Sequence, residues 1–253
     1  MRTGARTEVF AQRATLARSV GLLRQFRYEQ RDPARFYGAL AADTAAMVTD
    51  LWGAQPSGTL LDVGGGPGYF ASAFTAAGWH YIGVEPDPRE MHAAGRVSHG
   101  VPGAFVRGSG LALPVADDSV DVCLSSNVAE HVAAPWRLGE EMLRVTRPGG
   151  LVVLTYTVWL GPFGGHETGL WHYLGGGRAA DRYARRHGRR PKNDYGSSLF
   201  AVSAADGLRW ARSTGMLAAA FPRYHPRWAW WLTSVPGIRE VAVSNLTLVL
   251  AKR

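Results

Sequence analysis

A single cysteine, Cys123, occurs in the 253 residues of this chain. Because it lies inside an apolar run, the sequence supports no internal disulfide, no thiolate metal site and no redox pair. Long apolar segments are also missing. The cluster at 20–23 is too short for a signal peptide, and the longest apolar run, 151–160, is too short to cross a bilayer. These absences predict a cytoplasmic protein.

Internal repeats and low-complexity tracts are absent as well, which excludes solenoid and fibrous architectures. Hydrophobic residues make up 46% of the chain and charged residues 19%, which is typical of a folded globular protein. A length of 253 residues suits one α/β domain with insertions and falls short of two full domains. We therefore expect one hydrophobic core.

The net charge of +8 is unevenly spread. Residues 1–35 carry eight Arg against three acids, and residues 178–192 carry seven basic side chains against one acid. Residues 36–177, in contrast, carry six Arg against thirteen acids. An acidic core with basic arms indicates a negatively charged partner, such as a lipid headgroup, a phosphorylated glycan or nucleic acid. The alternative is that the arginines form solvated helix faces.

The most informative stretch is the glycine cluster Gly64, Gly65, Gly66 and Gly68. It follows a predicted strand at 59–63 and precedes a predicted helix at 69–78. A strand-to-helix turn without side chains lets a ligand approach the main chain closely. A tight turn alone needs only one or two glycines, so the cluster predicts a ligand-binding loop.

The identity of the ligand follows from the residues beside the glycines. Tyr69 occupies the position where a dinucleotide-binding loop has its third glycine or alanine, and Pro67 removes an amide that could bind a pyrophosphate. NAD, and with it an oxidoreductase, is thus the second choice. Asp62 followed by G-x-G-x-G instead resembles motif I of the class I S-adenosylmethionine (SAM) methyltransferases. Glu85 ends the next predicted strand, 80–84, where a carboxylate can bind both ribose hydroxyls.

A second motif narrows the resemblance. The run L-R-V-T-R-P-G-G-L-V-V-L at 143–154 is similar to a motif of the methyltransferase type 11 family, and the likeness covers residues 58–157. Over its remainder the chain resembles uncharacterised actinobacterial methyltransferases. The resemblance implies a Rossmann-like α/β fold with a seven-stranded sheet in the order 3-2-1-4-5-7-6 and the last strand antiparallel. It also implies N-terminal helices and a cap insertion after the fifth strand.

We accordingly divide one domain, 1–253, into four segments. Residues 1–53 form an N-terminal helical lid, 58–157 the SAM-binding core, 158–200 the substrate cap, and 201–253 a C-terminal helix and strand pair with a Trp-rich insertion. In the lid, a helix at 5–29 is expected to carry Val9, Leu16, Val20 and Leu23 on one stripe, facing the core or a membrane surface. A second helix should start at Pro33, capped by Asp32.

The resemblance also implies the residues that bind SAM, whose product would be S-adenosylhomocysteine. These are Asp62, Gly64, Gly65, Gly66, Gly68, Glu85, Pro86, Ser109, Gly110, Leu111 and Asn127. Ser109 departs from the family pattern, because the family has an Asp there that binds the adenine amino group. The departure weakens that contact and leaves open whether the backbone of Gly110 and Leu111 holds the adenine.

Methyl transfer to a hydroxyl requires a base and close approach of the acceptor. His131 is the first candidate, because it follows the fourth predicted strand, 119–126, at the edge where open α/β sheets bind ligands. His166 is the second candidate for a catalytic role, and packing is the alternative role for His131. Acceptor binding is predicted for Tyr37, His131, His166, Trp171 and His172. The spacing of these histidines indicates no metal site.

These features predict a SAM-dependent methyltransferase that acts on a hydroxyl or carboxyl oxygen of an amphipathic or lipid-linked acceptor. The segment Trp228-Ala-Trp-Trp231 and the basic arms could attach the protein to an anionic membrane, at its inner face. For the tryptophans, the alternatives are a substrate cleft or core packing. A nucleic-acid methyltransferase is disfavoured because no N-P-P-[YFW] motif follows the fourth strand. A non-catalytic SAM-binding or membrane-binding module is the remaining alternative.

Overall fold

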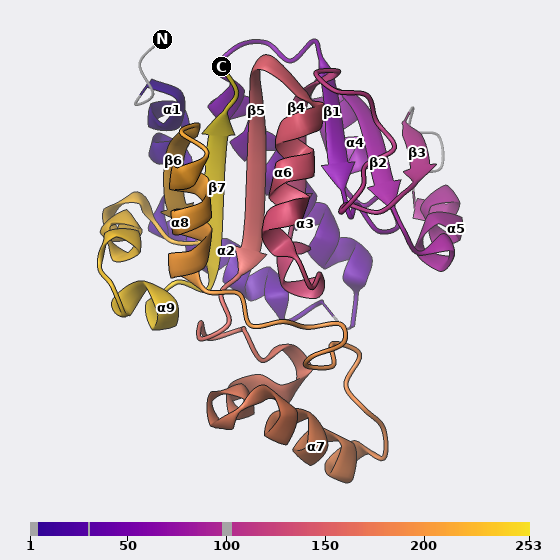
Figure 1. Ribbon diagram of the computed structural model, residues 1–253, viewed down its shortest axis with the longest axis vertical. Helices are drawn as coiled ribbons and strands as arrows, with labels where there is room; N and C mark the ends of the chain where they lie inside the picture. Colours follow the sequence, from indigo (N-terminus) through magenta and orange to yellow (C-terminus); the bar gives the residue numbers. More distant parts are fainter. Residues whose placement is uncertain (1–4, 30, 98–102) are drawn as a thin grey trace.

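A computed structural model describes residues 5–29, 31–97 and 103–253 (Figure 1). The first four residues of the predicted lid segment lie outside the described residues. A seven-stranded sheet with the order β3-β2-β1-β4-β5-β7-β6 forms the centre, which confirms the predicted topology. Its strands are β1 (Thr59–Val63), β2 (His80–Glu85), β3 (Ala104–Arg107), β4 (Val120–Ser126), β5 (Thr146–Thr157), β6 (Leu217–Pro222) and β7 (Asn245–Ala251). β7 runs antiparallel to both of its neighbours, β5 and β6, as predicted.

Helices cover both faces of the sheet, so successive strand residues enter two different cores. In β1, for example, Leu61 belongs to the core under α6 (Pro135–Val145) and α8 (Ala204–Ser213). Leu60 belongs to the opposite core, under α1 (Ala5–Arg13), α3 (Pro33–Trp52) and α4 (Ala71–Ala76). α5 (Pro88–Val97) follows β2. The central strands are therefore continuous apolar runs rather than alternating ones.

The predicted single helix at 5–29 is wrong. The chain forms α1 and, after a break at Ala14 and Thr15, α2 (Leu16–Phe26). The Thr15 side chain accepts a hydrogen bond from the backbone N–H of Arg18 and so starts α2. α1 buries Phe10, whereas no residue of α2 is buried. The predicted apolar stripe is consequently exposed rather than packed on the core.

Other element boundaries agree with the sequence. α3 begins at Pro33, and the Asp32 side chain accepts a hydrogen bond from Arg35 N at 3.2 Å. Ser203 caps α8 by accepting from Asp206 N. Between β6 and β7 lie a 3₁₀ helix, η3 (Arg227–Ser234), and α9 (Ile238–Ala242). η3 contains the three tryptophans of the Trp-rich segment.

The segment after β5 projects from the carboxyl edge of the sheet (Figure 1). It contains the 3₁₀ helix η2 (His166–Leu174) and α7 (Gly176–His187). Two backbone hydrogen bonds tie its return to the core: Phe200 N donates to Glu130 O at 2.8 Å, and Trp159 N donates to Val202 O at 2.9 Å. The insertion is thereby held over the ends of β4 and β5. Within the described part of the chain, no helix is long and apolar enough to cross a membrane.

Candidate functional site

The glycine loop lies at the carboxyl end of β1, where the strand order reverses between β1 and β4. Gly64, Gly66 and Gly68 have φ angles of +78°, +53° and +77°, a region that disfavours other residues. A Cβ at Gly64 would lie 2.5 Å from Val128 Cγ2, whereas a Cβ at Gly66 would meet no atom within 4 Å. The loop thus packs tightly on its inner side and leaves room for a ligand beside Gly66.

Glu85 ends β2 next to this loop. Its Oε2 accepts a hydrogen bond from Gly66 N at 3.0 Å, and its Oε1 accepts one from Asp87 N at 3.0 Å. These bonds hold the carboxylate at the edge of the loop, with lone pairs left for further donors. Pro86, also predicted to contact SAM, follows in an exposed position.

Asp62 lies beneath the loop rather than in it. It is 2% exposed, and the Tyr81 hydroxyl donates to its Oδ2 at 2.7 Å. The pKa of Asp62 is raised to about 7, because burial and, to a smaller extent, the nearby charge of Glu85 raise it by more than the Tyr81 hydrogen bond lowers it. Sequence analysis gave Tyr81 no role, because its partner lies on a neighbouring strand. Register could have suggested the pair, since β1 and β2 are parallel neighbours.

The part of the predicted cofactor site that is expected to hold the adenine is a turn after β3. Ser109 Oγ accepts from Leu111 N at 3.1 Å, and Ser109 O accepts from Ala112 N at 3.1 Å. The side chain that replaces the family's Asp is therefore already used to shape this turn. Gly110 packs closely, because a Cβ there would lie 2.7 Å from Leu138 Cδ1.

Asn127 follows β4 at the same edge of the sheet. Its φ of +57° is unusual for a residue with a side chain, and such strain is common at functional sites. The backbone N–H donates to Thr155 O at 2.9 Å, and Asn245 Nδ2 donates to the side-chain Oδ1 at 2.8 Å. Sequence analysis did not single out Asn245, which begins β7 far along the chain.

The lid meets the loop through two tyrosines. The Tyr37 ring, on α3, stacks on that of Tyr69 with centroids 4.7 Å apart and an interplanar angle of 11°. Burial raises the pKa of Tyr37 to about 12, so its hydroxyl stays protonated and can act as a donor. Tyr37 thus lies against the glycine loop, where it was predicted to contact the acceptor.

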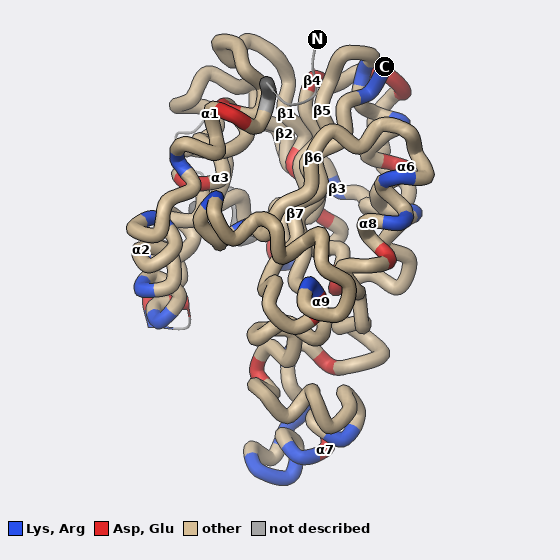
Figure 2. The backbone as a smooth tube through the Cα atoms, turned by 90° about the vertical axis from the view of Figure 1, so that its left-hand side faces the viewer, with Lys and Arg blue, Asp and Glu red and all other residues tan. Residues whose placement is uncertain are grey.

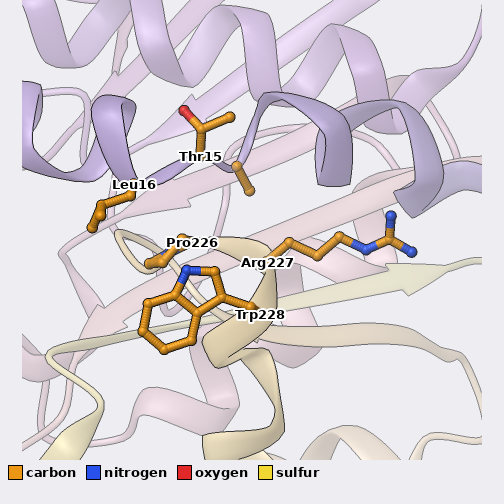
Figure 3. A pocket seen from close by; sticks show the side chains of 6 residues that line it. Thr15, Leu16, Pro226, Arg227 and Trp228 are labelled. Atoms are coloured by element: carbon orange, nitrogen blue, oxygen red, sulfur yellow. The ribbon is translucent and has the colours of Figure 1, made fainter.

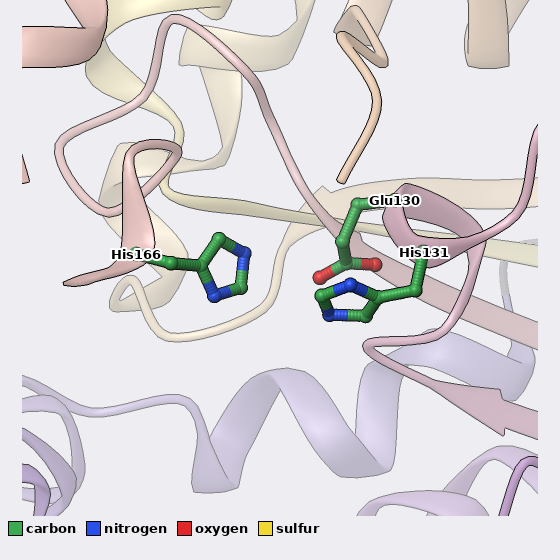
Figure 4. A group of neighbouring side chains, drawn as sticks. All are labelled: Glu130, His131 and His166. Carbon is green, nitrogen blue, oxygen red and sulfur yellow. The ribbon is translucent and has the colours of Figure 1, made fainter. Parts of the chain in front are cut away.

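Three side chains converge where the cap meets the end of β4: Glu130, His131 and His166 (Figure 4). Glu130 and His131 belong to a short 3₁₀ helix, η1 (Ala129–His131), and His166 begins η2 in the cap. The rings of His131 and His166 are 5.1 Å apart. We define these three residues as the Glu-His-His cluster. The structure therefore brings together the two histidines that were predicted to be catalytic.

Hydrogen bonding fixes the state of His131. Its Nδ1 lies 2.7 Å from Ser198 O, and a carbonyl oxygen can only accept, so Nδ1 carries the proton. In the neutral ring, Nε2 then holds the free lone pair. Ser198 lies in a turn near the end of the cap segment, so the cap itself orients this ring.

Glu130 and His166 each leave one polar atom unpaired. Glu130 is 1% exposed; its Oε1 accepts from Thr157 N at 3.0 Å, while Oε2 has no hydrogen-bond partner among the described residues. His166 Nε2 is likewise buried and unpaired within the described chain. Burial raises the pKa of Glu130 and lowers that of His166 to about 4, so His166 is neutral at physiological pH. Buried unpaired atoms of this kind require an explanation, and a bound polar group would satisfy both.

The remaining cap residues lie outside the Glu-His-His cluster. His172 is 1% exposed, its Nδ1 lies 2.7 Å from Gly169 O, and its charge contributes to the lowered pKa of His166. Trp171 is 45% exposed and stacks under the guanidinium of Arg182 at 3.7 Å. These positions place His172 behind His166 and Trp171 at the cap surface.

The cluster also has the composition of a metal site. Each member offers one ligand atom, and these atoms lie within 4.8 Å of one another. Two His and one carboxylate can hold a transition metal. No spacing in the sequence pointed to this set, because His166 joins the other two only through the fold of the cap.

Comparisons with known proteins agree with this geometry. Residues 61–154 match the methyltransferase domain family. The chain is 76% identical over 251 residues to a protein described as an uncharacterised methyltransferase of Mycolicibacterium gilvum, covering 97% of this chain and 98% of that protein. It is 75% identical over 252 residues to one of Mycobacterium marinum, covering 98% and 99%.

A solved structure of an S-adenosylmethionine-dependent methyltransferase from Mesorhizobium loti shares the fold. Its TM-score is 0.55 at 17% identity, and the alignment covers 78% of this chain and 92% of that one. The overall fold is therefore that of a known architecture.

Proposed function

The chain belongs to the family of SAM-dependent methyltransferases that includes these mycobacterial proteins, and from this premise we propose that it methylates an oxygen of an amphipathic or lipid-linked acceptor. The observation that carries the proposal is the Glu-His-His cluster at the carboxyl edge of the sheet, where His131 presents Nε2 as a base. The methyl acceptor and its acceptor atom are what we propose here, whereas the cofactor SAM follows from the family.

The residues around the glycine loop fit SAM. Space beside Gly66, where a Cβ would meet nothing within 4 Å, suits a ligand that lies against the main chain. The carboxylate of Glu85 stands at the tip of the neighbouring strand, where it can accept from ribose hydroxyls. When bound, SAM supplies a methyl group that its sulfonium already makes electrophilic.

The task left to the protein is therefore to place the acceptor and remove its proton. His131 Nε2 would accept the proton of an acceptor hydroxyl as the oxygen forms its new bond to carbon and the carbon–sulfur bond breaks toward sulfur. Ser198 O keeps the ring in the required tautomer. Glu130, beside His131, would stabilise the imidazolium that results.

An amphipathic acceptor is supported by an aromatic group that includes Phe163, whose backbone O accepts a hydrogen bond from His166 N at 3.1 Å. Where the end of α2 meets the cap loop, the Phe26 ring lies 5.0 Å from that of Phe163 and 5.8 Å from that of Phe36. Phe26 and Phe163 are 40% and 39% exposed, so they offer aromatic surface to a ligand. Polar atoms at the centre and aromatic surface around them are typical of small-molecule sites.

The test uses SAM with a radioactive methyl group and a fractionated extract of the protein's own cells. We expect label in an organic-solvent fraction, and alkaline hydrolysis then distinguishes the two oxygen products. A methyl ester releases labelled methanol, whereas a methyl ether keeps its label. Incorporation only into nucleic acid, or label on nitrogen in the isolated product, would contradict the proposed acceptor.

A further inference from the structure

The helix α2 turns its apolar side toward solvent. Leu16, Val20 and Leu23 recur at the helical spacing i, i+4, i+7 and are 57%, 36% and 59% exposed. A surface helix of a globular protein normally packs such a stripe on the core. Here none of the residues of α2 is buried. The stripe is therefore left without a partner in the described chain.

Buried charges hold α2 in this orientation. Arg18 points inward, where its Nε lies 2.6 Å from Asp43 Oδ1, and Arg223 Nη2 lies 2.8 Å from Asp43 Oδ2. These three side chains are at most 10% exposed. Arg18 lies between Leu16 and Val20 in sequence, so fixing it toward the core fixes them outward. The exposure is thus a property of a firmly anchored helix.

The apolar surface continues from α2 onto η3. Trp228 and Trp231 are 70% and 55% exposed, and residues three apart in a 3₁₀ helix share one side. Arg227 N donates to Ala14 O at 2.7 Å, which joins the two elements. A groove between them is lined by Ala14, Thr15, Leu16, Pro226, Arg227 and Trp228 (Figure 3). We define Leu16, Val20, Leu23, Trp228 and Trp231 as the apolar ridge.

The two elements that carry the ridge, α2 and η3, hold only basic charges. Neither α2 nor η3 contains an acidic residue. Arg24 on α2, Arg27 directly after α2 and Arg227 on η3 are exposed, and Figure 2 shows basic residues along α2. Tryptophan and leucine beside arginine are the composition of a surface that enters the headgroup region of an anionic bilayer.

We propose that the apolar ridge docks this protein on an anionic phospholipid bilayer. The ridge side chains enter the interface, and Arg24, Arg27 and Arg227 contact lipid phosphates. α2 ends at Phe26, which contacts Phe163 in the loop that leads to His166, so docking brings this loop close to the bilayer. This surface goes beyond the proposed function, and it can be tested without turnover.

Cosedimentation with vesicles of equal parts phosphatidylcholine and phosphatidylglycerol tests the proposal. We expect wild-type protein to sediment at low salt and to be released by high salt. The double variants Trp228→Ser/Trp231→Ser and Leu16→Ser/Leu23→Ser should each weaken binding at least about tenfold. All four side chains are exposed, so both variants should fold, as circular dichroism and unchanged SAM binding would verify.

Matched controls come from the cap. Leu170 and Leu174 are 66% and 62% exposed, and their double Ser variant should bind vesicles like wild type. A variant with Arg182, Arg185 and Arg186 changed to Gln tests whether the basic side chains of α7 alone attract the protein to the vesicle. The proposal is overturned if the wild-type protein does not bind vesicles, if the ridge variants bind them as tightly as wild type does, or if only the α7 variant loses vesicle binding. It is also overturned if the ridge variants instead convert a dimer to a monomer.

Discussion

The side-chain amide of Asn245 donates a hydrogen bond to Oδ1 of Asn127 at 2.8 Å. The same amide also donates to Thr157 Oγ1 at 3.1 Å. Asn127 leaves β4 in a left-handed conformation, so its side chain needs external support to keep one orientation. Asn245 begins β7 opposite Thr157, the last residue of β5, and thus holds the Asn127 side chain at the carboxyl edge of the sheet.

Replacing Asn245 with Ala should therefore weaken SAM binding although the side chain does not face the loop. Loss of one buried hydrogen bond costs about 1 kcal/mol, or roughly fivefold in affinity. Thr247→Val is the matched control, because Thr247 lies two residues along the same strand and its buried hydroxyl has no partner among the described residues. Calorimetry should show reduced affinity for the first variant and wild-type affinity for the second. Equal affinities in all three proteins would refute the positioning role.

Glu85 provides the most direct test of the cofactor site. Glu85→Ala removes the carboxylate that is expected to accept from both ribose hydroxyls. Two charge-assisted hydrogen bonds are worth about 3 kcal/mol together, so SAM affinity should fall roughly 100-fold while the fold persists. Glu140→Ala, at an exposed position on α6, is the control for a lost carboxylate. Undiminished binding of SAM by the Glu85 variant would contradict the assignment.

The core could be predicted from the sequence because its signals are local. Asp32 and Pro33 start α3, the glycine cluster marks the loop after β1, and the sheet order follows from the family resemblance. The orientation of α2 could not be predicted, because apolar spacing left open whether the stripe faces the core or a membrane surface. It depends on the ion pair between Arg18 and Asp43, which are 25 residues apart.

The Glu-His-His cluster likewise could be predicted only in part from the sequence. Sequence position placed His131 at the edge of the sheet, and His166 was a candidate because it lies in the cap insertion. Their meeting depends on the cap, which Ser198 and Phe200 tie to the end of β4 through hydrogen bonds. Contacts between residues that are so far apart in the chain leave no signal in hydrophobic periodicity or motif spacing.

Asp62 should make stability depend on pH in an unusual direction. Its pKa is raised from 3.8 to about 7 in the folded protein, so folding favours its protonated form. The resulting stabilisation is full below pH 3.8 and is lost as pH rises through about 7. Between these values the free energy of unfolding should fall by up to about 1.4 kcal/mol per pH unit.

Urea unfolding of the SAM-free protein at pH 5 and pH 8 measures this effect. Asp62→Asn keeps an oxygen that can accept from the Tyr81 hydroxyl and does not titrate. The difference in stability between wild type and variant should therefore shift in favour of the variant at pH 8. A difference that stays constant with pH would show that Asp62 remains ionised over the whole range.

His131 should control the rate of methyl transfer without controlling SAM binding. Loss of a general base lowers kcat about 10²- to 10⁴-fold, so we expect a fall of that order in His131→Gln with the acceptor fraction as substrate. Calorimetry should show that the variant binds SAM with wild-type affinity. His187→Gln, exposed at the end of α7, should retain wild-type kinetics.

Treatment with a chelator distinguishes two roles for His131, a general base and a metal ligand. The three ligand atoms of the Glu-His-His cluster lie within 4.8 Å of one another, so a bound cation would also make His131 essential. Since we propose that Nε2 of His131 accepts the proton of the acceptor, we expect activity to withstand exhaustive treatment with EDTA. Inactivation by EDTA that a divalent cation reverses, together with loss of cation binding in His166→Gln, would replace the general base with a metal-bound acceptor.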